Sequence, residues 1–270
     1  MLTWRKHDFD CRITPLGGPT LLIEVDDLCV LVDPVLGGSP ECAPPGGATG
    51  RELASAFGAE DDHLAEALED GIDCVLVTDP DHLDQAGRVF ALRAPTLMVG
   101  GDGQLPGAPG RAFEENAEAV VSDTVLIWAV TPSSGAAEEA WISGFWINAE
   151  ACAIHIAGDR TTVDMMREYA TVMGPLWAAV VRSGAVRDHG GTEPPLTADG
   201  LVEGARALGM PLVVLAHPDA GERSARVGAA ARRAFDRAGI GYALADLYPG
   251  EPIEIGMGEG QADPARWPST

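Results

Sequence analysis

The sequence lacks most of the features that would place a protein on nucleic acid, in a membrane or outside the cell. It has a single lysine, Lys6, and its 18 basic residues face 41 acidic ones, for a formal net charge of -23. Nucleic acids and anionic lipids are bound by basic patches, so neither partner is expected. No apolar run approaches the length of a membrane span, and residues 1–10 lack the apolar core of a signal peptide. We therefore expect a soluble, cytoplasmic protein, and we interpret the acidity as serving solubility.

Motifs for several other kinds of chemistry are also missing. The five cysteines are scattered and nowhere spaced as CxxC, which excludes a zinc knuckle and is typical of reduced, cytosolic thiols. The glycine-rich stretch GGDGQLPGAPG lacks the Gly-Lys-Ser/Thr ending of a phosphate-binding loop. Ser133 and Ser134 have no Gly-x-Ser-x-Gly elbow around them, so a serine nucleophile is not expected.

What the sequence does contain is a repeated alternation of short β-rich runs and helical patterns. The predicted strands are 13–16, 20–25, 28–33, 73–78, 96–100, 124–131, 141–148, 152–157, 176–182, 211–216 and 242–247, and the predicted helices are 51–57, 61–68, 85–93, 162–173, 197–208 and 222–238. A β-meander followed by β-α units occurs twice. This order predicts an α/β protein with two mixed sheets packed face to face and helices outside, a four-layer αβ/βα sandwich.

The domain organisation follows from the same pattern. We expect one domain over residues 1–255, built from two β-α halves of about 1–123 and 124–255. Residues 256–270 are rich in glycine and proline and are predicted to form a loosely held C-terminal tail.

The order of elements and several motifs resemble the metallo-β-lactamase fold superfamily, in particular its branch of small cytosolic hydrolases related to the ascorbate-lactone hydrolases. The resemblance covers residues 13–255. The opening ITPLGGPTLLIEVDDLCVLVDPVLGG, with its Asp33-Pro34 pair, is similar to the first three strands of that branch. This part of the resemblance concerns the fold and says nothing about chemistry.

The motifs that carry metal ions in the superfamily are present only in part. Pro80-Asp81-His82-Leu83-Asp84-Gln85 resembles the signature turn His-x-His-x-Asp-His, but Pro80 and Gln85 stand where histidines are expected. A third histidine of the family falls near Ser133 or Ser134. AGDR resembles the Gly-Asp-Thr motif and places the bridging carboxylate at Asp159, and VVLAHPD places the last ligand at His217.

The resemblance therefore implies an incomplete metal site at the carboxyl edge of the sheets. The side chains of His82, Asp84, Asp159 and His217 come from three segments that end strands or follow them directly, so they could converge at one point. Carboxylates, imidazoles and an amide suit one divalent ion, Zn, Mn or Fe, and a site with no ion at all is the alternative. The implied ligands are His82, Asp84, Asp159 and His217, with Gln85, Asp79 and His189 as further candidates.

Each of these residues also has an ordinary structural interpretation. Asp84 and Asp159 could cap the helices that follow them, and His217 could be a satisfied loop histidine. Asp79 and Asp81 fit ordinary turn chemistry around Pro80, and His189 fits an exposed loop.

The leading functional prediction is a metallo-β-lactamase-like hydrolase with a single metal ion, acting on a small metabolite of lactone, ester or amide type. Asp81, His82 and Asp84 are the candidate catalytic residues, with Asp81 or Asp79 as general base. One alternative is a degenerate, non-catalytic homologue that binds a small molecule or a partner protein without metal. Another is metal-free acid/base catalysis by Asp81, His82 and Asp84.

Overall fold

A computed structural model describes residues 11–36, 71–99, 111–112, 118–130, 144–149, 152–172, 174–182 and 196–255. Its strands form two seven-stranded sheets. The first sheet has the order β14-β1-β2-β3-β4-β5-β6, in which β1, β2 and β3 form an antiparallel meander and β3 to β6 run parallel. Its strands are β1 (Cys11–Gly17), β2 (Thr20–Val25), β3 (Leu28–Val32), β4 (Cys74–Val77), β5 (Thr96–Val99), β6 (Arg111–Ala112) and β14 (Ile253–Ile255).

The second sheet has the order β13-β12-β11-β10-β9-β8-β7. Strands β7 to β10 are antiparallel neighbours, whereas β10 to β13 run parallel. Its strands are β7 (Glu118–Val120), β8 (Leu126–Val130), β9 (Gly144–Asn148), β10 (Ala153–Ala157), β11 (Ala178–Arg182), β12 (Leu212–Ala216) and β13 (Leu244–Leu247).

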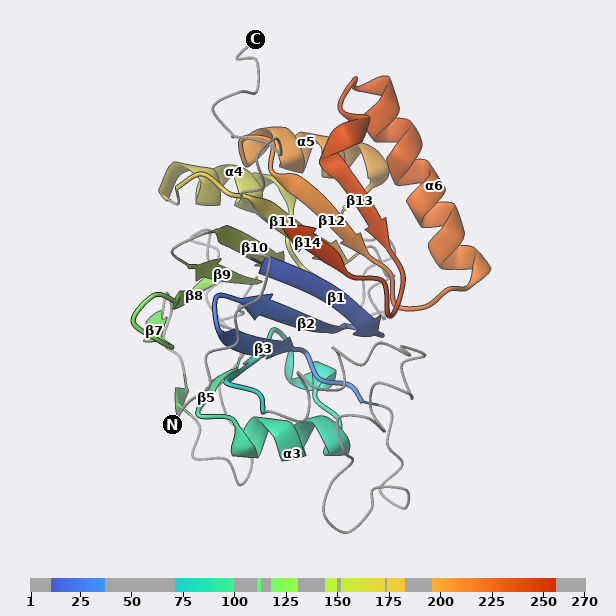
Figure 1. Cartoon of the computed structure of the whole chain (residues 1–270). Coiled ribbons are helices and arrows are strands. Elements are labelled where there is room, and N and C mark those ends of the chain that lie inside the picture. Colours follow the sequence, from blue (N-terminus) through green and yellow to red (C-terminus); the bar gives the residue numbers. More distant parts are fainter. Residues whose placement is uncertain are drawn as a thin grey trace, which may run out of the picture.

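The two sheets face each other, and helices cover their outer sides (Figure 1). Helix α3 (Gln85–Arg93) lies on the first sheet, and α4 (Val163–Val172), α5 (Ala198–Ala207) and α6 (Glu222–Arg237) lie on the second. One apolar cluster fills the space between the sheets. A second cluster lies between the second sheet and its helices, and a third lies between the first sheet and α3. The predicted four-layer αβ/βα sandwich is confirmed.

Several local predictions also correspond to observed elements. The predicted helix 85–93 has the bounds of α3, and most predicted strands differ from the observed ones by one or two residues. The run predicted as strand 242–247 begins instead with a 3-10 turn, η2 (Gly241–Ala243), before β13. The short strands β6, β7 and β14 were not predicted. The predicted helices 51–57 and 61–68 and the tail 256–270 lie outside the described residues.

The topology places the ends of several strands from both sheets at one edge. The carboxyl ends of β3 and β4 lead directly to Asp33 and Thr78, those of β10 and β12 lead to Asp159 and His217, and β11 itself ends at Arg182. Because neighbouring parallel strands end on the same side, polar residues at these positions are brought close to one another. No helix in the described part of the chain has the length and apolarity needed to cross a membrane.

Candidate functional site

Asp33 is the buried centre of a polar cluster at this edge. Its side chain is fully buried, and its backbone adopts a left-handed conformation with φ of 47°. The backbone N–H of Thr78 donates to Asp33 Oδ1 and the Thr78 hydroxyl donates to Oδ2, both over 2.5 Å. The turn is held further by the Thr20 hydroxyl, which donates to the Asp33 carbonyl over 2.9 Å. These contacts fix the carboxylate at the end of the first sheet.

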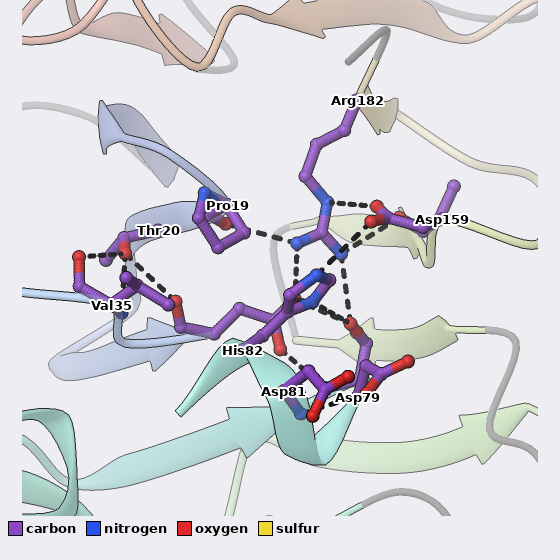
Figure 2. Close-up of polar contacts among 11 residues, drawn as sticks. Pro19, Thr20, Val35, Asp79, Asp81, His82, Asp159 and Arg182 are labelled. Carbon is purple, nitrogen blue, oxygen red and sulfur yellow. Dashed lines mark hydrogen bonds and ion pairs between the residues drawn. The ribbon is translucent and has the colours of Figure 1, made fainter. Parts of the chain in front are cut away.

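Arg182, the last residue of β11, reaches this carboxylate from the second sheet. Figure 2 shows its guanidinium beside Asp159 and His82. Its side chain is only 7% exposed, and Nη1 forms an ion pair with Asp33 Oδ2. Nη2 donates to the Thr78 hydroxyl over 3.1 Å, and Nη1 donates to the carbonyl of Pro19 over 3.2 Å. Nε lies 3.4 Å from Asp159 Oδ1, close enough for an ion pair, although it does not form a hydrogen bond there. The guanidinium therefore contacts carboxylates from both halves of the chain.

His82 joins the same two carboxylates from the opposite side. It lies in the short 3-10 helix η1 (Pro80–His82), directly after β4. Nδ1 is 3.3 Å from Asp33 Oδ2, and Nε2 is 3.2 Å from Asp159 Oδ2. Asp159 is 32% exposed, so its carboxylate is the most accessible part of the cluster. We call Asp33, Thr78, His82, Asp159 and Arg182 the rim cluster.

The rim cluster is balanced in charge. Burial alone would lower the pKa of His82, but the hydrogen bonds to Asp159 and Asp33 outweigh it and raise the pKa to about 9. Burial opposes ionisation of Asp33, yet Arg182 and then His82 lower its pKa. Burial also opposes ionisation of Asp159, and the bond to His82 followed by the charge of Arg182 lowers its pKa. At neutral pH two cations thus neutralise two carboxylates.

Three members of the rim cluster were not among the predicted site residues. Asp33 was used only as a sign of the fold, and Thr78 and Arg182 were not considered. A signal was nevertheless present, because each ends or directly follows an apolar run, LCVLV, CVLV and AAVV. The strand-end rule that selected Asp159 and His217 would have selected them too. A search limited to metal-binding residue types excludes arginine, which has no lone pair to donate.

The other predicted residues of the signature turn have local roles. Asp84 caps helix α3, where its Oδ1 accepts a hydrogen bond from the N–H of Gly87 over 2.7 Å. Asp79 caps η1 and accepts from the N–H of Asp81 over 2.9 Å. The side chains of Asp81 and Gln85 are exposed. The predicted residue His189 lies outside the described part of the chain.

His217 belongs to a second polar cluster. Its Nε2 is 2.5 Å from Asp246 Oδ1, and its ring stacks on Tyr248 with centroids 4.9 Å apart. Asp246 Oδ2 also accepts from Nε of Arg232 on helix α6 over 3.1 Å. Helix α6 approaches this closely because residue 228 is glycine: a Cβ there would lie 2.6 Å from Asp246 Oδ2. The carboxylate that His217 contacts is thus Asp246, and not Asp84 or Asp159 as the predicted metal site required. We call His217, Arg232, Asp246 and Tyr248 the β13 cluster.

Of the four principal predicted ligands, the structure thus brings together His82 and Asp159 and engages Asp84 and His217 elsewhere. Within the described ranges, no three side chains of His, Cys, Asp or Glu are grouped to hold a metal ion. At the rim, both ring nitrogens of His82 face carboxylates, and Arg182 already supplies a cation to each of them. A divalent ion placed between the two carboxylates would meet the positive charge of Arg182, so the side chains as arranged do not fit such an ion.

Comparison with solved structures shows the metallo-β-lactamase fold. The chain is similar to isothiocyanate hydrolase from Delia radicum gut bacteria, with 17% identity, a TM-score of 0.61 and coverage of 90% of this chain and 99% of that one. It is also similar to a possible metal-dependent hydrolase from Veillonella parvula, with 13% identity, a TM-score of 0.63 and coverage of 92% and 100%. The metallo-β-lactamase fold protein YhfI from Bacillus subtilis gives 14% identity, a TM-score of 0.54 and coverage of 90% and 99%.

Sequence comparisons add no closer relationship. No family model matches the chain, and no curated protein matches it. The structural neighbours are hydrolases and related proteins of this fold. Because their sequence identity to this chain is low, the similarity shows a shared architecture and nothing more.

Proposed function

We propose that this protein is a metal-independent member of the metallo-β-lactamase fold that binds a small molecule at the rim cluster. The observation that carries the proposal is the position of Arg182, whose guanidinium lies against both carboxylates of the cluster. A fixed arginine supplies there the positive charge that a metal ion would otherwise bring to Asp33 and Asp159. A divalent cation would be repelled by Arg182 and would have to displace the proton of His82.

The proposed ligand is small and uncharged, with a hydroxyl or amide N–H group. Asp159 is the most accessible member of the cluster, and a carboxylate offers only acceptor lone pairs, so a matching ligand must donate a hydrogen bond. Because the cluster is already balanced in charge, a charged ligand would leave it with an excess of one sign. We propose binding and not hydrolysis because His82, Asp33 and Asp159 are already paired with one another and with Arg182, so none of these three groups is left unpaired to act as a base.

Metal content tests the first half of this proposal. The purified protein, supplemented with Zn, Mn and Fe(II) and then desalted, should retain no stoichiometric metal by mass spectrometry, and a chelator should leave its melting temperature unchanged. In Arg182→Met the repulsion is removed, so this variant serves as the comparison. The proposal would be overturned if the wild type retained stoichiometric metal that raised its melting temperature, and if Asp159→Asn lost both the metal and this rise.

Ligand binding tests the second half. A panel of neutral hydroxylated and amide compounds is screened by thermal shift with the wild type and with Asp159→Asn, which keeps the shape of the side chain. A compound that binds through the rim cluster should raise the melting temperature of the wild type and lose that effect in the variant. Exposed Asp81 gives a matched control, and Asp81→Asn should bind as the wild type does.

A hydrolase with a single metal ion is the second candidate, supported by the descriptions of the fold neighbours and by the contact between His82 and Asp159. It requires Arg182 to leave the two carboxylates and other donors to join His82 and Asp159. Turnover of lactones, esters or amides that is abolished by chelator and restored by one metal would favour this candidate over the binding protein.

We also propose that the protein acts in the cytoplasm without nucleic-acid or membrane partners.

A further inference from the structure

One buried histidine of the second sheet belongs to neither the rim cluster nor the β13 cluster. His155 is the central residue of β10, and its side chain is 0% exposed. In the part of the chain that the structure describes, neither of its ring nitrogens has a hydrogen-bond partner. Burial removes the hydrogen bonds of a polar group to water, so a group left without replacements needs an explanation beyond packing.

The surroundings of this imidazole are apolar and aromatic. On β9, Trp146 is opposite His155 in the strand register, and the two ring centroids are 5.8 Å apart. On helix α4, the ring of Tyr169 meets it edge-on at 5.7 Å. Ala179 is its register partner on β11. All three neighbours belong to the apolar cluster between the second sheet and its helices. His155 therefore faces the helices, and α4 packs on it.

The charged side chains of the neighbouring elements point elsewhere. Strands β9, β10 and β11 contain one charged residue besides His155, Arg182, which lies in the rim cluster. On α4, helical spacing places Asp164, Arg167 and Glu168 opposite the buried residues, and the first two form an exposed ion pair. The aromatic rings that contact His155 take up no proton in acid. An imidazolium at this position would have no counter-ion.

This environment favours the neutral imidazole. Burial lowers the pKa of His155 from 6.5 to about 4, and the nearby backbone of Phe145, which makes no hydrogen bond to the ring, offsets only part of that effect. A ring exposed to water regains its ordinary pKa, so a proton binds the open form more tightly than the closed form. The stability that depends on the neutral ring is thus fully present above pH 6.5, and it declines as the pH falls from 6.5 through about 4.

Helix α4 is joined directly to the rim cluster. Residues 158–162 connect the end of β10 to the start of α4, and Asp159 is the second of them. This connection is a tight turn, in which the N–H of Thr161 donates to the carbonyl of Gly158 over 3.1 Å and Thr161 is fully buried. A displacement of α4 from the sheet would therefore move the backbone that positions Asp159 against His82.

We propose that His155 makes the packing of α4 sensitive to acid, so that mild acidification releases α4 from the second sheet together with the segment that carries Asp159. The open form takes up one proton on the free ring nitrogen of His155, and a return to neutral pH removes it and lets the helix pack again. The expected fall in ligand affinity at acid pH rests on the proposed function of the rim cluster. The opening itself requires no ligand.

The interval between pH 7 and pH 5 separates this effect from the charges of the rim cluster. The pKa of His82 is raised to about 9 and those of Asp33 and Asp159 are lowered, so these three groups keep their charges there. For His155, the ordinary and the lowered pKa together predict that the equilibrium constant for opening increases about 20-fold from pH 7 to pH 5.

Hydrogen exchange of the full, folded chain, followed by mass spectrometry, tests the proposal. Protection factors, which correct for the intrinsic pH dependence of exchange, are measured at both pH values for peptides from α4, from residues 158–162 and from α6. Protection in the first two should fall about 20-fold at pH 5. Helix α6, which α5 separates from α4 in Figure 1, should keep its protection.

Two results with the wild type alone would overturn the proposal. One is equal protection of α4 at pH 7 and pH 5, which would show that acid does not release the helix. The other is an equal loss in α6, which would show that acid weakens the whole fold and not this helix. Neither result needs a ligand, so a rim cluster that bound nothing would refute the proposed function and leave this test unaffected.

Two variants assign the response to this imidazole. His155→Leu replaces the ring with an apolar side chain of similar size, and its α4 should be equally protected at pH 7 and pH 5. His217→Asn changes another buried histidine of the second sheet and should keep the response of the wild type. If His155→Leu still lost protection at pH 5, another group would carry the response and the proposal would be wrong.

Discussion

The rim cluster and the β13 cluster each contain a histidine beside a carboxylate, yet they connect different parts of the molecule. His82 contacts Asp33 from the first sheet and Asp159 from the second, so the rim cluster joins the two halves of the chain. His217 contacts Asp246 on the adjacent strand β13, and Arg232 comes from the helix over the same sheet. The arginines of the two clusters differ also in exposure: the side chain of Arg182 is 7% exposed, whereas that of Arg232 is 58% exposed.

This difference shows that the role of a histidine at a strand end depends on which side chains contact it. Both histidines follow an apolar strand, and the sequence resemblance implied a metal ligand at each. At His82 the partners are charges from both sheets, and at His217 they are local side chains that position β13 and α6. The same sequence signal therefore marks a junction between sheets in one place and a contact within one half in the other.

Removal of Asp33 should have the largest effect on stability. In Asp33→Ala, the buried Arg182 and His82 lose their shared counter-ion, and we expect the free energy of unfolding to fall by about 3–5 kcal/mol. Guanidinium denaturation measures the loss. Adding Arg182→Met to Asp33→Ala should recover part of this loss, because the unpaired guanidinium is then removed as well. A double variant no more stable than Asp33→Ala would show that charge pairing does not govern this junction.

The pH dependence of stability should also come from the rim cluster. The pKa of His82 is raised from 6.5 to about 9, so its contribution is fully present below pH 6.5 and is lost as the pH rises through about 9. The corresponding loss is on the order of 3 kcal/mol. The lowered pKa values of Asp33 and Asp159 act in the opposite direction, and their contributions are lost as the pH falls into the acid range.

Chemical denaturation at pH 6 and pH 9.5 compares the two histidines directly, with both values chosen to bracket the raised pKa. In His82→Asn the alkaline decline should be largely absent, whereas His217→Asn should retain it. An unchanged alkaline decline in His82→Asn would assign that dependence to another group.

Removal of Asp246 should cost less than removal of Asp33. In Asp246→Ala the ring of His217 loses its hydrogen-bond partner at Nε2, and we expect a loss of about 1–3 kcal/mol. Arg232 can turn toward water instead of remaining as an unpaired buried charge. Denaturation of Asp33→Ala and Asp246→Ala side by side measures the contrast, and an equal or larger loss for Asp246→Ala would reverse the ranking of the two clusters.

The smallest effect is expected for Arg232. Because this side chain is largely exposed, Arg232→Ala should lower the free energy of unfolding by less than about 1 kcal/mol. The matched change Arg182→Ala at the rim should be several times more destabilising. Thermal melts of the two variants at equal salt concentration give this comparison, and similar losses would show that burial does not separate the two arginines.

The fold could be predicted from the sequence because its strands are apolar and its turns contain marked residues. The hairpin between β1 and β2 has Gly17 and Gly18 with positive φ, and Asp26 takes a positive φ in the next turn. Strands such as β4 and β12, buried along all or nearly all of their length, appear as continuous apolar runs. Strands of two or three residues, such as β6 and β14, carry too little pattern to be predicted in this way.

The rim cluster could be predicted only in part. The turn after β4 indicated His82, and the end of β10 indicated Asp159, but spacing along the chain does not show which side chains meet across two sheets. The contact between Arg182 and Asp33 joins residues of different sheets and depends on how these sheets pack. The pairing of His217 with Asp246 could not be predicted from the sequence either, because Asp246 lies within a strand and no motif surrounds it.

Strand β14 has a consequence for how the protein is made. Residues 253–255 pair with the start of β1, so the first sheet receives its outermost strand from the opposite end of the described chain. During translation β1 leaves the ribosome before β14, and its free edge must wait until the whole chain between the two strands has been synthesised. A chaperone that shields exposed strand edges would therefore be expected to act on the nascent protein throughout that interval.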